Sequence, residues 1–459
     1  MSAYVKEARA TAALALPIIV GQVSQMLIGI TDSVMIGRVG TVPLAASAFA
    51  STLFGMIFVV GIGLLVPVAV LVSRAHGARS DEEAGAWLRH GLVMGGGVGI
   101  LGVVVLLLIG TQLHRFGQSA EVLAAVSPYY EVVSFSVIPA MIFQVLRQFA
   151  EAMGRPWLPM VIMLAGVGLN GLLNWVLIWG HWGAPELGLA GAGWATLIAR
   201  VAGAVVLYLW VRNFPGFAPA WPYRGTQRGW LDGLSRERFT TMLHIGVPAA
   251  GMLMFEAGAF SAAAVMVGWL GAVPLAAHQI ALTCAAFTFM FPLGLSTAAS
   301  MRLSRAVGEK NRESLRPIGY SALAMSTAVM AVFALIFGLG GGLLAAGFVE
   351  DTEVIALAGR LLFVAAIFQL FDGAQVVGAG ALRGLADVKV PTVITFIAYW
   401  LVALPGGYFL GVRGPFGAIG VWAALAAGLA FAAVFLAWRF ARLTRADRPL
   451  AAAGGLVLH

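Results

Sequence analysis

Long apolar stretches separated by short polar breaks run along nearly the whole chain. Each stretch holds about 18 residues or more, enough for a helix to cross a hydrocarbon core of about 30 Å. Backbone that faces lipid must satisfy its hydrogen bonds within the segment, so each stretch is expected to be α-helical. The pattern predicts twelve membrane-spanning helices, over residues 12–37, 47–72, 88–110, 126–150, 158–180, 187–212, 241–268, 275–300, 318–345, 358–381, 391–412 and 416–440.

The composition supports this interpretation. Hydrophobic residues make up 60% of the chain, charged residues 10%, and the mean hydropathy is +0.92. Soluble domains carry about 25% charged residues, so the predicted fold class is an all-α polytopic membrane protein. The single cysteine, Cys284, excludes a disulfide scaffold and cysteine-ligated zinc or iron–sulfur sites. The first apolar stretch is longer than a signal-peptide core of about 7–15 residues, so we expect it to be retained.

The net charge of +8 would suit a nucleic-acid partner only if the basic residues formed one patch. Most of the 28 Lys and Arg residues instead lie at helix ends and loops on one side of the predicted membrane. The positive-inside rule makes that side cytoplasmic, together with both termini and the loop 213–240. We therefore expect a multi-pass membrane protein and no nucleic-acid partner. Arg200 is the one base placed well inside a span.

The two halves of the chain are copies of one another. Residues 17–77 align without a gap on residues 248–308, with matching Pro-Leu-Ala-Ala and Ser-Arg-Ala-x-Gly blocks. Six helices per half is an even number, so the halves share one orientation and a pseudo-two-fold axis along the membrane normal. The predicted organisation is an amino-terminal lobe (1–212), a cytoplasmic linker loop (213–240) and a carboxy-terminal lobe (241–459). Such paired six-helix lobes are typical of transporters that work by alternating access.

Three acidic residues lie well inside the predicted spans: Asp32, Glu256 and Asp372. In the repeat, Asp32 aligns with Ala263 and Glu256 with Gln25, so the fold itself does not require these charges. An ionisable residue inside a span is costly and is functional by default, although a hydrogen bond between helices is the alternative explanation. We interpret the three acids as candidate cation, proton or substrate sites.

Two further polar residues lie in the stretch GVGLNGLLNW, where Asn170 and Asn174 are four residues apart on one helical face. An amide offers an oxygen to a hard cation and an N–H to a carboxylate, but ordinary hydrogen bonding between helices would also explain the pair. With Asp32, these oxygens suit sodium, whereas an isolated desolvated carboxylate suits a proton, and both alternatives stay open. Pro17 predicts a hinge in the first helix, because proline cannot donate a helical hydrogen bond.

Four stretches resemble one known family: LPIIVGQVSQMLIGITDSVMIG (16–37), PLAAHQIAL (274–282), FMFPLGLSTAASMRLSRAVGE (289–309) and FDGAQVVGAGALRG (371–384). Together with twelve spans in 459 residues, they make the chain similar to the multidrug and toxic compound extrusion (MATE) transporters, and to the NorM-like branch among them. The resemblance covers nearly the whole chain and implies a location in the bacterial inner membrane.

The resemblance implies roles for the residues singled out above. Asp32 matches the cation or proton site of the family's amino lobe, with Asn170 and Asn174 beside it. Glu256 and Asp372 match carboxy-lobe acids that the NorM-like branch uses for a cation or substrate and that the DinF-like branch lacks. The second lobe's acids therefore place the chain on the NorM-like side.

We predict a secondary active antiporter that exports organic, cationic and amphipathic compounds in exchange for Na⁺ or H⁺. No cofactor is expected, and without a Walker-type phosphate loop ATP is not the energy source. No nucleophile–base pair or metal-ligand set lies within the spans, so the chain is not expected to be an enzyme. The alternative is a flippase for a lipid-linked oligosaccharide precursor, which acids rather than bases in the cavity helices disfavour. The expected partners are small-molecule drugs and membrane lipid, and the chain is expected to be a monomer.

Overall fold

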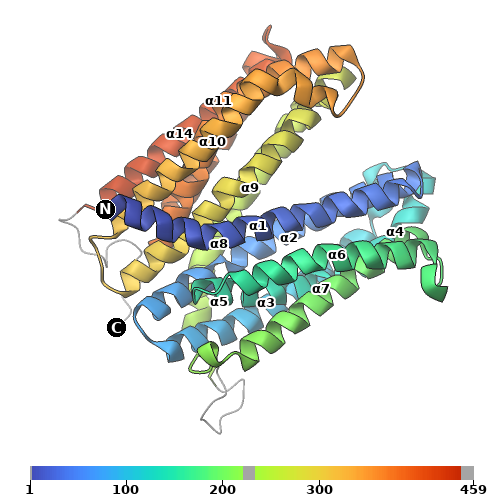
Figure 1. The fold of residues 1–459 in the computed structure, drawn as a ribbon. Helices are drawn as coiled ribbons and strands as arrows, with labels where there is room; N and C mark the ends of the chain where they lie inside the picture. Colours follow the sequence, from blue (N-terminus) through green and yellow to red (C-terminus); the bar gives the residue numbers. More distant parts are fainter. Residues whose placement is uncertain (1–2, 221–232, 446–459) are drawn as a thin grey trace. The chain divides into compact units, whose positions relative to one another are not determined.

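The computed structural model describes residues 3–220 and 233–445, and helices build it throughout (Figure 1). Within these two ranges there is no β-strand. The α-helices are α1 (Ala3–Gly37), α2 (Thr41–Gly77), α3 (Asp81–Gly110), α4 (Ala120–Phe135), α5 (Val137–Ala152), α6 (Trp157–Trp179), α7 (Gly188–Asn213), α8 (Arg236–Gly268), α9 (Ala272–Gly308), α10 (Leu315–Ala346), α11 (Thr352–Gly384), α12 (Lys389–Phe396), α13 (Leu404–Gly407) and α14 (Gly417–Leu443).

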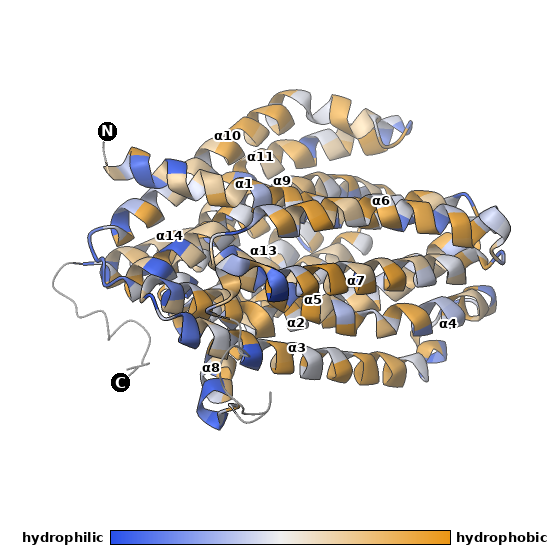
Figure 2. Ribbon diagram, turned by 60° about the horizontal axis from the view of Figure 1, so that its bottom comes forward, coloured by the Kyte–Doolittle hydropathy of each residue, from blue (hydrophilic) through white to orange (hydrophobic). Residues whose placement is uncertain are grey.

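The described residues contain twelve helical segments long and apolar enough to cross a membrane, which confirms the predicted all-α fold with twelve spans. Hydrophobic residues run along the helices, and hydrophilic residues gather toward their ends (Figure 2). Several helices extend beyond the predicted apolar run, because polar residues continue the helix outside the hydrocarbon. In α3 the first turn holds Asp81, Glu82 and Glu83, and the Ser80 side chain accepts a hydrogen bond from the backbone N–H of Glu83.

The fourth span, Ala120–Ala152, is interrupted at Ser136, where α4 ends and α5 begins. The predicted span over 126–150 did not contain this break. Pro139 gives its physical cause, because its ring nitrogen has no N–H to offer the carbonyl of Phe135. Ser136 lies between the two helices, and its hydroxyl accepts a hydrogen bond from Arg200.

The eleventh span, Lys389–Val412, contains two π-helical segments, η4 (Ile397–Ala403) and η5 (Tyr408–Val412). They flank the short helix α13, which holds Pro405. A proline removes one helical hydrogen bond. In a π-helical turn the hydrogen bonds join residues five apart instead of four, which accommodates this local change. Such widened turns occur frequently at functional sites.

The chain divides into two compact units: unit 1, Met1–Ile19 with Gly251–His459, and unit 2, Val20–Ala250. In unit 1, α11 packs against α9, α10 and α14. In unit 2, α3 and α5 pack against α2 and against each other, and α6 packs against α7. The packing boundaries thus fall inside α1 and α8, whereas the repeat placed them at the loop 213–240. Residues 221–232 of that loop lie outside the described residues, and the lobe assignment from the repeat stays a prediction.

The first part of α1 is held within unit 1. Ala15 and Ile18 are buried in a cluster with Leu295 and Ala298 of α9. The first part of α8 is held within unit 2, where Ala249 packs against two valines of α2.

Two repeat-related glycines permit these contacts. A Cβ added at Gly63 of α2 would lie 2.4 Å from the Cα of Ala250, and one added at Gly294 of α9 would lie 3.1 Å from the backbone N of Ile19. Gly63 aligns with Gly294 in the internal repeat, and Ile19 aligns with Ala250. Each unit therefore uses a glycine at the same repeat position to bring a crossing helix against its neighbour.

Candidate functional site

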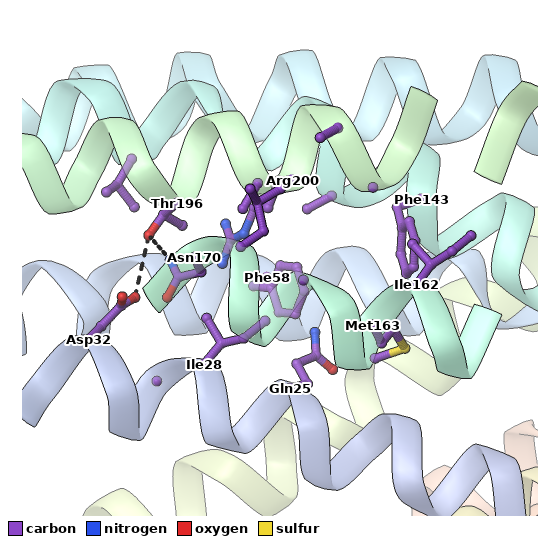
Figure 3. Close-up of a pocket in the computed structure, with 18 of the residues that line it drawn as sticks. Gln25, Ile28, Asp32, Phe58, Phe143, Ile162, Met163, Asn170, Thr196 and Arg200 are labelled. Carbon is purple, nitrogen blue, oxygen red and sulfur yellow. Dashed lines mark hydrogen bonds between the residues drawn. The ribbon is translucent and has the colours of Figure 1, made fainter. Parts of the chain in front are cut away.

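A cavity of about 410 Å³ lies within unit 2, lined by α1, α2, α4, α5, α6 and α7 (Figure 3). Its size is in the range of drug-binding cavities, which are mostly apolar with a few polar groups that orient the ligand. The apolar wall includes Phe54, Phe58, Phe143, Ile162 and Met163. The polar lining residues are Gln25, Asp32, Ser51, Tyr129, Gln144, Asn170, Thr196 and Arg200.

Asp32 of α1 lines this cavity and lies at the centre of a polar cluster. The Asn174 side-chain Nδ2 donates to Asp32 Oδ1 over 2.6 Å, and the Thr196 hydroxyl donates to Asp32 Oδ2 over 3.3 Å. Asn170 supports both donors: its Nδ2 lies 3.4 Å from Thr196 Oγ1, and its Oδ1 lies 3.4 Å from Asn174 Nδ2. Each carboxylate oxygen therefore accepts a hydrogen bond, which stabilises the ionised form.

Helical spacing explains how these side chains converge. Asn170 and Asn174 are one turn apart on α6, and Thr196 and Arg200 are one turn apart on α7, so each helix presents two polar groups on one face. The two asparagines and Thr196 are buried. Sequence reasoning identified the first pair but missed Thr196 and took Arg200 only as a base inside a span. The same four-residue spacing in the sixth predicted span was the signal that would have found the second pair.

The cluster has ligands that fit a small hard cation. The Asn174 Oδ1 atom is buried and has no hydrogen-bond partner among the described residues. An unpartnered amide oxygen next to a carboxylate is the kind of donor that sodium binds, since hard cations prefer oxygen ligands. A proton on Asp32 would equally remove the charge from the apolar surroundings. The residues present fit either ion.

The structure also brings together the two acids predicted in the carboxy lobe. Asp372 of α11 is buried, Glu256 of α8 is half-buried, and their charges lie close enough to interact. The charge of Arg383 interacts electrostatically with Glu256, and Tyr399 of the π-helical segment η4 interacts electrostatically with both acids. All four residues belong to unit 1.

Several buried polar atoms in the same helices of unit 1 have no hydrogen-bond partner among the described residues. They include both amide atoms of Gln369, Oε1 of Gln375, Nε of Arg383 and the hydroxyl of Tyr399. Buried polar groups are usually hydrogen-bonded, so these atoms mark the interior of unit 1 around α11 as unusually polar. Sequence reasoning named Glu256 and Asp372 but missed Gln369, one helical turn before Asp372, and Tyr399 on the neighbouring span.

Comparison with known proteins agrees with this architecture. The family model MatE matches residues 17–176 and 248–409, two stretches that begin at the repeat-related Pro17 and Pro248. A probable multidrug resistance protein NorM of Mesorhizobium japonicum is 35% identical over 459 residues, covering 97% of this chain and 96% of the relative. The multidrug resistance protein NorM of Burkholderia vietnamiensis is 34% identical over 440 residues, covering 94% and 93%.

The chain belongs to the MATE family. Its similarity to NorM proteins over nearly the full length places it in the NorM-like branch. The crystal structure of the eukaryotic MATE transporter AtDTX14 superimposes with a TM-score of 0.87 at 20% identity, covering 99% of this chain and 98% of that one. At that identity the match shows the fold alone.

Family membership settles several expectations. The protein is a multidrug efflux transporter of the MATE family and not an enzyme, and its substrates are small molecules. The family needs no cofactor. The twelve spans and the bacterial relatives support a multi-pass protein of the inner membrane.

Proposed function

We propose that this MATE transporter is a secondary antiporter that exports organic compounds from the cavity in unit 2 in exchange for Na⁺ or H⁺ at Asp32. The observation that carries the proposal is the Asp32 cluster at the wall of a drug-sized cavity. A carboxylate in an apolar helix is expensive unless a bound ion or proton neutralises it. The gradient of that ion across the membrane would then provide the free energy that drives efflux.

Coupling requires that the ion bind the two transport conformations differently, because equal affinity would shift no equilibrium. The Asp32 ligands come from α1, α6 and α7, so a change in the path of α1 would alter the ion site. Pro17 is the proposed hinge, since it lies in α1 two residues before the end of the segment packed in unit 1. Glu256 and Asp372 form a proposed second site for a cation or a cationic substrate.

The proposed substrates are amphipathic, with a cationic group that Asp32 would attract and apolar parts that Phe54, Phe58 and Met163 would contact. A lipid-linked precursor with a pyrophosphate group would need several bases, and Arg200 is the one Lys or Arg residue among the cavity-lining residues. The flippase alternative therefore has less support. We further propose that the transporter is monomeric in the lipid bilayer and that both termini face the cytoplasm.

Asp32→Asn tests the proposal, because the substitution keeps the shape of the side chain and removes its titratable charge. Purified wild-type and variant proteins in liposomes should be compared under a sodium gradient and, separately, under a proton gradient. We expect the variant to fold and to lose gradient-driven efflux. Glu82→Gln removes an exposed carboxylate of the same unit and is the matched control. Efflux by Asp32→Asn at the wild-type rate would contradict the proposal.

A further inference from the structure

Four arginines gather at one corner of unit 1, where the start of α10 lies beside the end of α14. Arg312 Nη2 donates to the backbone carbonyl of Arg445 over 2.8 Å, and Arg316 Nε donates to the Thr444 hydroxyl over 3.4 Å. The fourth arginine, Arg442, belongs to the last turn of α14. Like charges repel one another, so a corner of this kind attracts an anion.

The helices themselves bring these residues together. A Cβ added at Gly319 of α10 would lie 2.1 Å from Cζ of Phe440 in α14, so only glycine permits this close approach. The Phe440 ring also packs edge-on against Tyr320, with ring centroids 5.7 Å apart. Leu315 and Ile318 of α10 are buried in the same cluster as Phe440. The position of the arginine corner therefore follows from the packing of two spans.

The internal repeat allows this corner to be compared with its counterpart in unit 2. The alignment continues past residue 308, because Arg79 and Lys310 occupy the same repeat position and both have a positive φ, 58° and 56°. The next two residues, Ser80 and Asn311, each accept a hydrogen bond from the backbone N–H three residues later. The turns before α3 and before α10 are thus equivalent.

The two copies differ in charge at these equivalent helix starts. Asp81 aligns with Arg312 and Gly85 with Arg316, while Glu313 lies between the two arginines. The start of a helix favours negative charge, and the first turn of α3 follows that rule with three acids. The positive-inside rule assigns both corners to the same side of the membrane, so it does not explain why only α10 begins with arginines.

The exposed face of α14 below this corner has the polarity profile of a lipid. Phe435, Trp438 and Arg442 are all exposed, and their spacing of three and four residues places them on one face of the helix. The Cζ atom of Arg442 lies 5.3 Å from the ring centroid of Trp438. Tryptophan is enriched at the membrane–water interface. The face therefore passes from apolar through interfacial to basic toward the end of the span.

We propose that this corner, formed by Arg312, Arg316, Arg442 and Arg445 beside Trp438, binds the phosphate headgroup of an anionic phospholipid. The planar donor fork of arginine matches phosphate oxygens, and basic pockets between spans at the cytoplasmic surface bind such headgroups. None of the ion pairs among the described residues involves Arg316 or Arg442.

The acyl chains of the bound lipid lie along the apolar part of α14, and its phosphate neutralises the corner. The bound lipid therefore stabilises the packing of α10 against α14. This site is separate from the cavity in unit 2, and it does not depend on the proposed function.

Native mass spectrometry of the detergent-purified protein tests the proposal with dioleoyl phosphatidylglycerol and dioleoyl phosphatidylcholine. The two lipids carry the same acyl chains, so a difference in affinity reports the charge of the headgroup. We expect the first phosphatidylglycerol to bind about tenfold more tightly than phosphatidylcholine. The double variant Arg316→Gln/Arg442→Gln should lose most of this preference, and Arg316→Lys/Arg442→Lys should retain part of it. Arg212→Gln, at the exposed end of α7 in unit 2, is the matched control.

Equal affinity of the wild type for the two lipids would overturn the proposal, as would an unchanged preference in the double variant. Arg442→Gln alone changes one exposed side chain, and it provides the same comparison if the double variant does not fold. Inorganic phosphate should not displace the bound phosphatidylglycerol, because the lipid is also held by its acyl chains. Displacement by phosphate would assign the corner to a free anion and contradict the proposal.

Discussion

The side-chain amide of Asn174 lies 2.6 Å from the carboxylate of Asp32, and this hydrogen bond ties α6 to the second part of α1. The first part of α1 is tied elsewhere: Arg302 of α9 donates to the carboxylate of Glu7 and, over 2.6 Å, to the hydroxyl of Thr11. One helix therefore carries an anchored end in unit 1 and the candidate ion site in unit 2. Under the proposed function, ion occupancy at Asp32 would therefore be linked to the path of α1.

Thr196→Val should alter coupling-ion affinity while retaining the shape of the side chain. The substitution removes the donor that lies 3.3 Å from Asp32 Oδ2, and a hydrogen bond to a charged group contributes about 1.5–3 kcal/mol. We expect the half-saturating concentration of the coupling ion for dye efflux to change about tenfold. Thr52→Val is the control, because the Thr52 hydroxyl bonds only its own helix. An unchanged ion dependence in Thr196→Val would show that Thr196 does not support the ion site.

Glu256→Gln and Asp372→Asn should each weaken drug resistance without lowering expression. The two acids lie close enough for their charges to interact, so they are expected to bind one cation together. Residues of one site are not independent, and the double variant should lose little more than the stronger single variant. Resistance assays and isotope-labelled cation binding would measure this. Additive effects would indicate separate roles, and full activity in all three variants would indicate a structural role.

Gly63→Ala should destabilise the protein, because the added Cβ would lie 2.4 Å from the Cα of Ala250 in α8. Backbone cannot yield as a flexible side chain does, and overpacking of this kind costs about 1–3 kcal/mol. Gly55→Ala lies in the same helix with no atom within 4 Å of the added Cβ, so it should be neutral or slightly stabilising. Thermal unfolding in detergent distinguishes the two. Equal melting temperatures would mean that the close approach of α2 and α8 is not required.

Pro17→Ala should slow transport more than it weakens substrate binding. Alanine restores a backbone N–H that can bond the carbonyl of Ala13, which stiffens α1 at the proposed hinge. We expect at least a roughly threefold lower turnover of dye efflux, with dye affinity changed less than turnover. Pro292→Ala is the control, since α9 lies entirely within unit 1. Equal slowing in both variants would remove the case for a hinge at Pro17.

The proposed orientation predicts which introduced cysteines a membrane-impermeant maleimide reaches in intact cells. In a Cys284→Ala background, Gln118→Cys should be labelled from outside, and Asn213→Cys only after permeabilisation. Both positions are exposed at helix ends or loops, so access depends on the side of the membrane and not on burial. Labelling of Asn213→Cys in intact cells would invert the topology derived from the positive-inside rule.

The sequence by itself determined the twelve spans, because lipid forces every crossing segment to form its backbone hydrogen bonds internally and the apolar runs have the necessary length. It also determined the family, through four stretches of residues that resemble those of the MATE transporters. Asp32, Asn170 and Asn174 were identified because polar groups in an apolar helix are costly and therefore noticeable. Each of these conclusions depends on the order of residue types along the chain, which the sequence contains without any knowledge of tertiary contacts.

The tertiary structure alone decided which side chains meet. Thr196 reaches Asp32 across 164 residues, and Arg200 reaches Ser136 because α4 and α5 part at that residue. Apolar composition fixes the length of a span but not its rotation or its neighbours, which depend on close packing around small residues such as Gly63. Packing also divides the compact units within α1 and α8, and the lobe division that the sequence placed in the loop 213–240 stays a prediction.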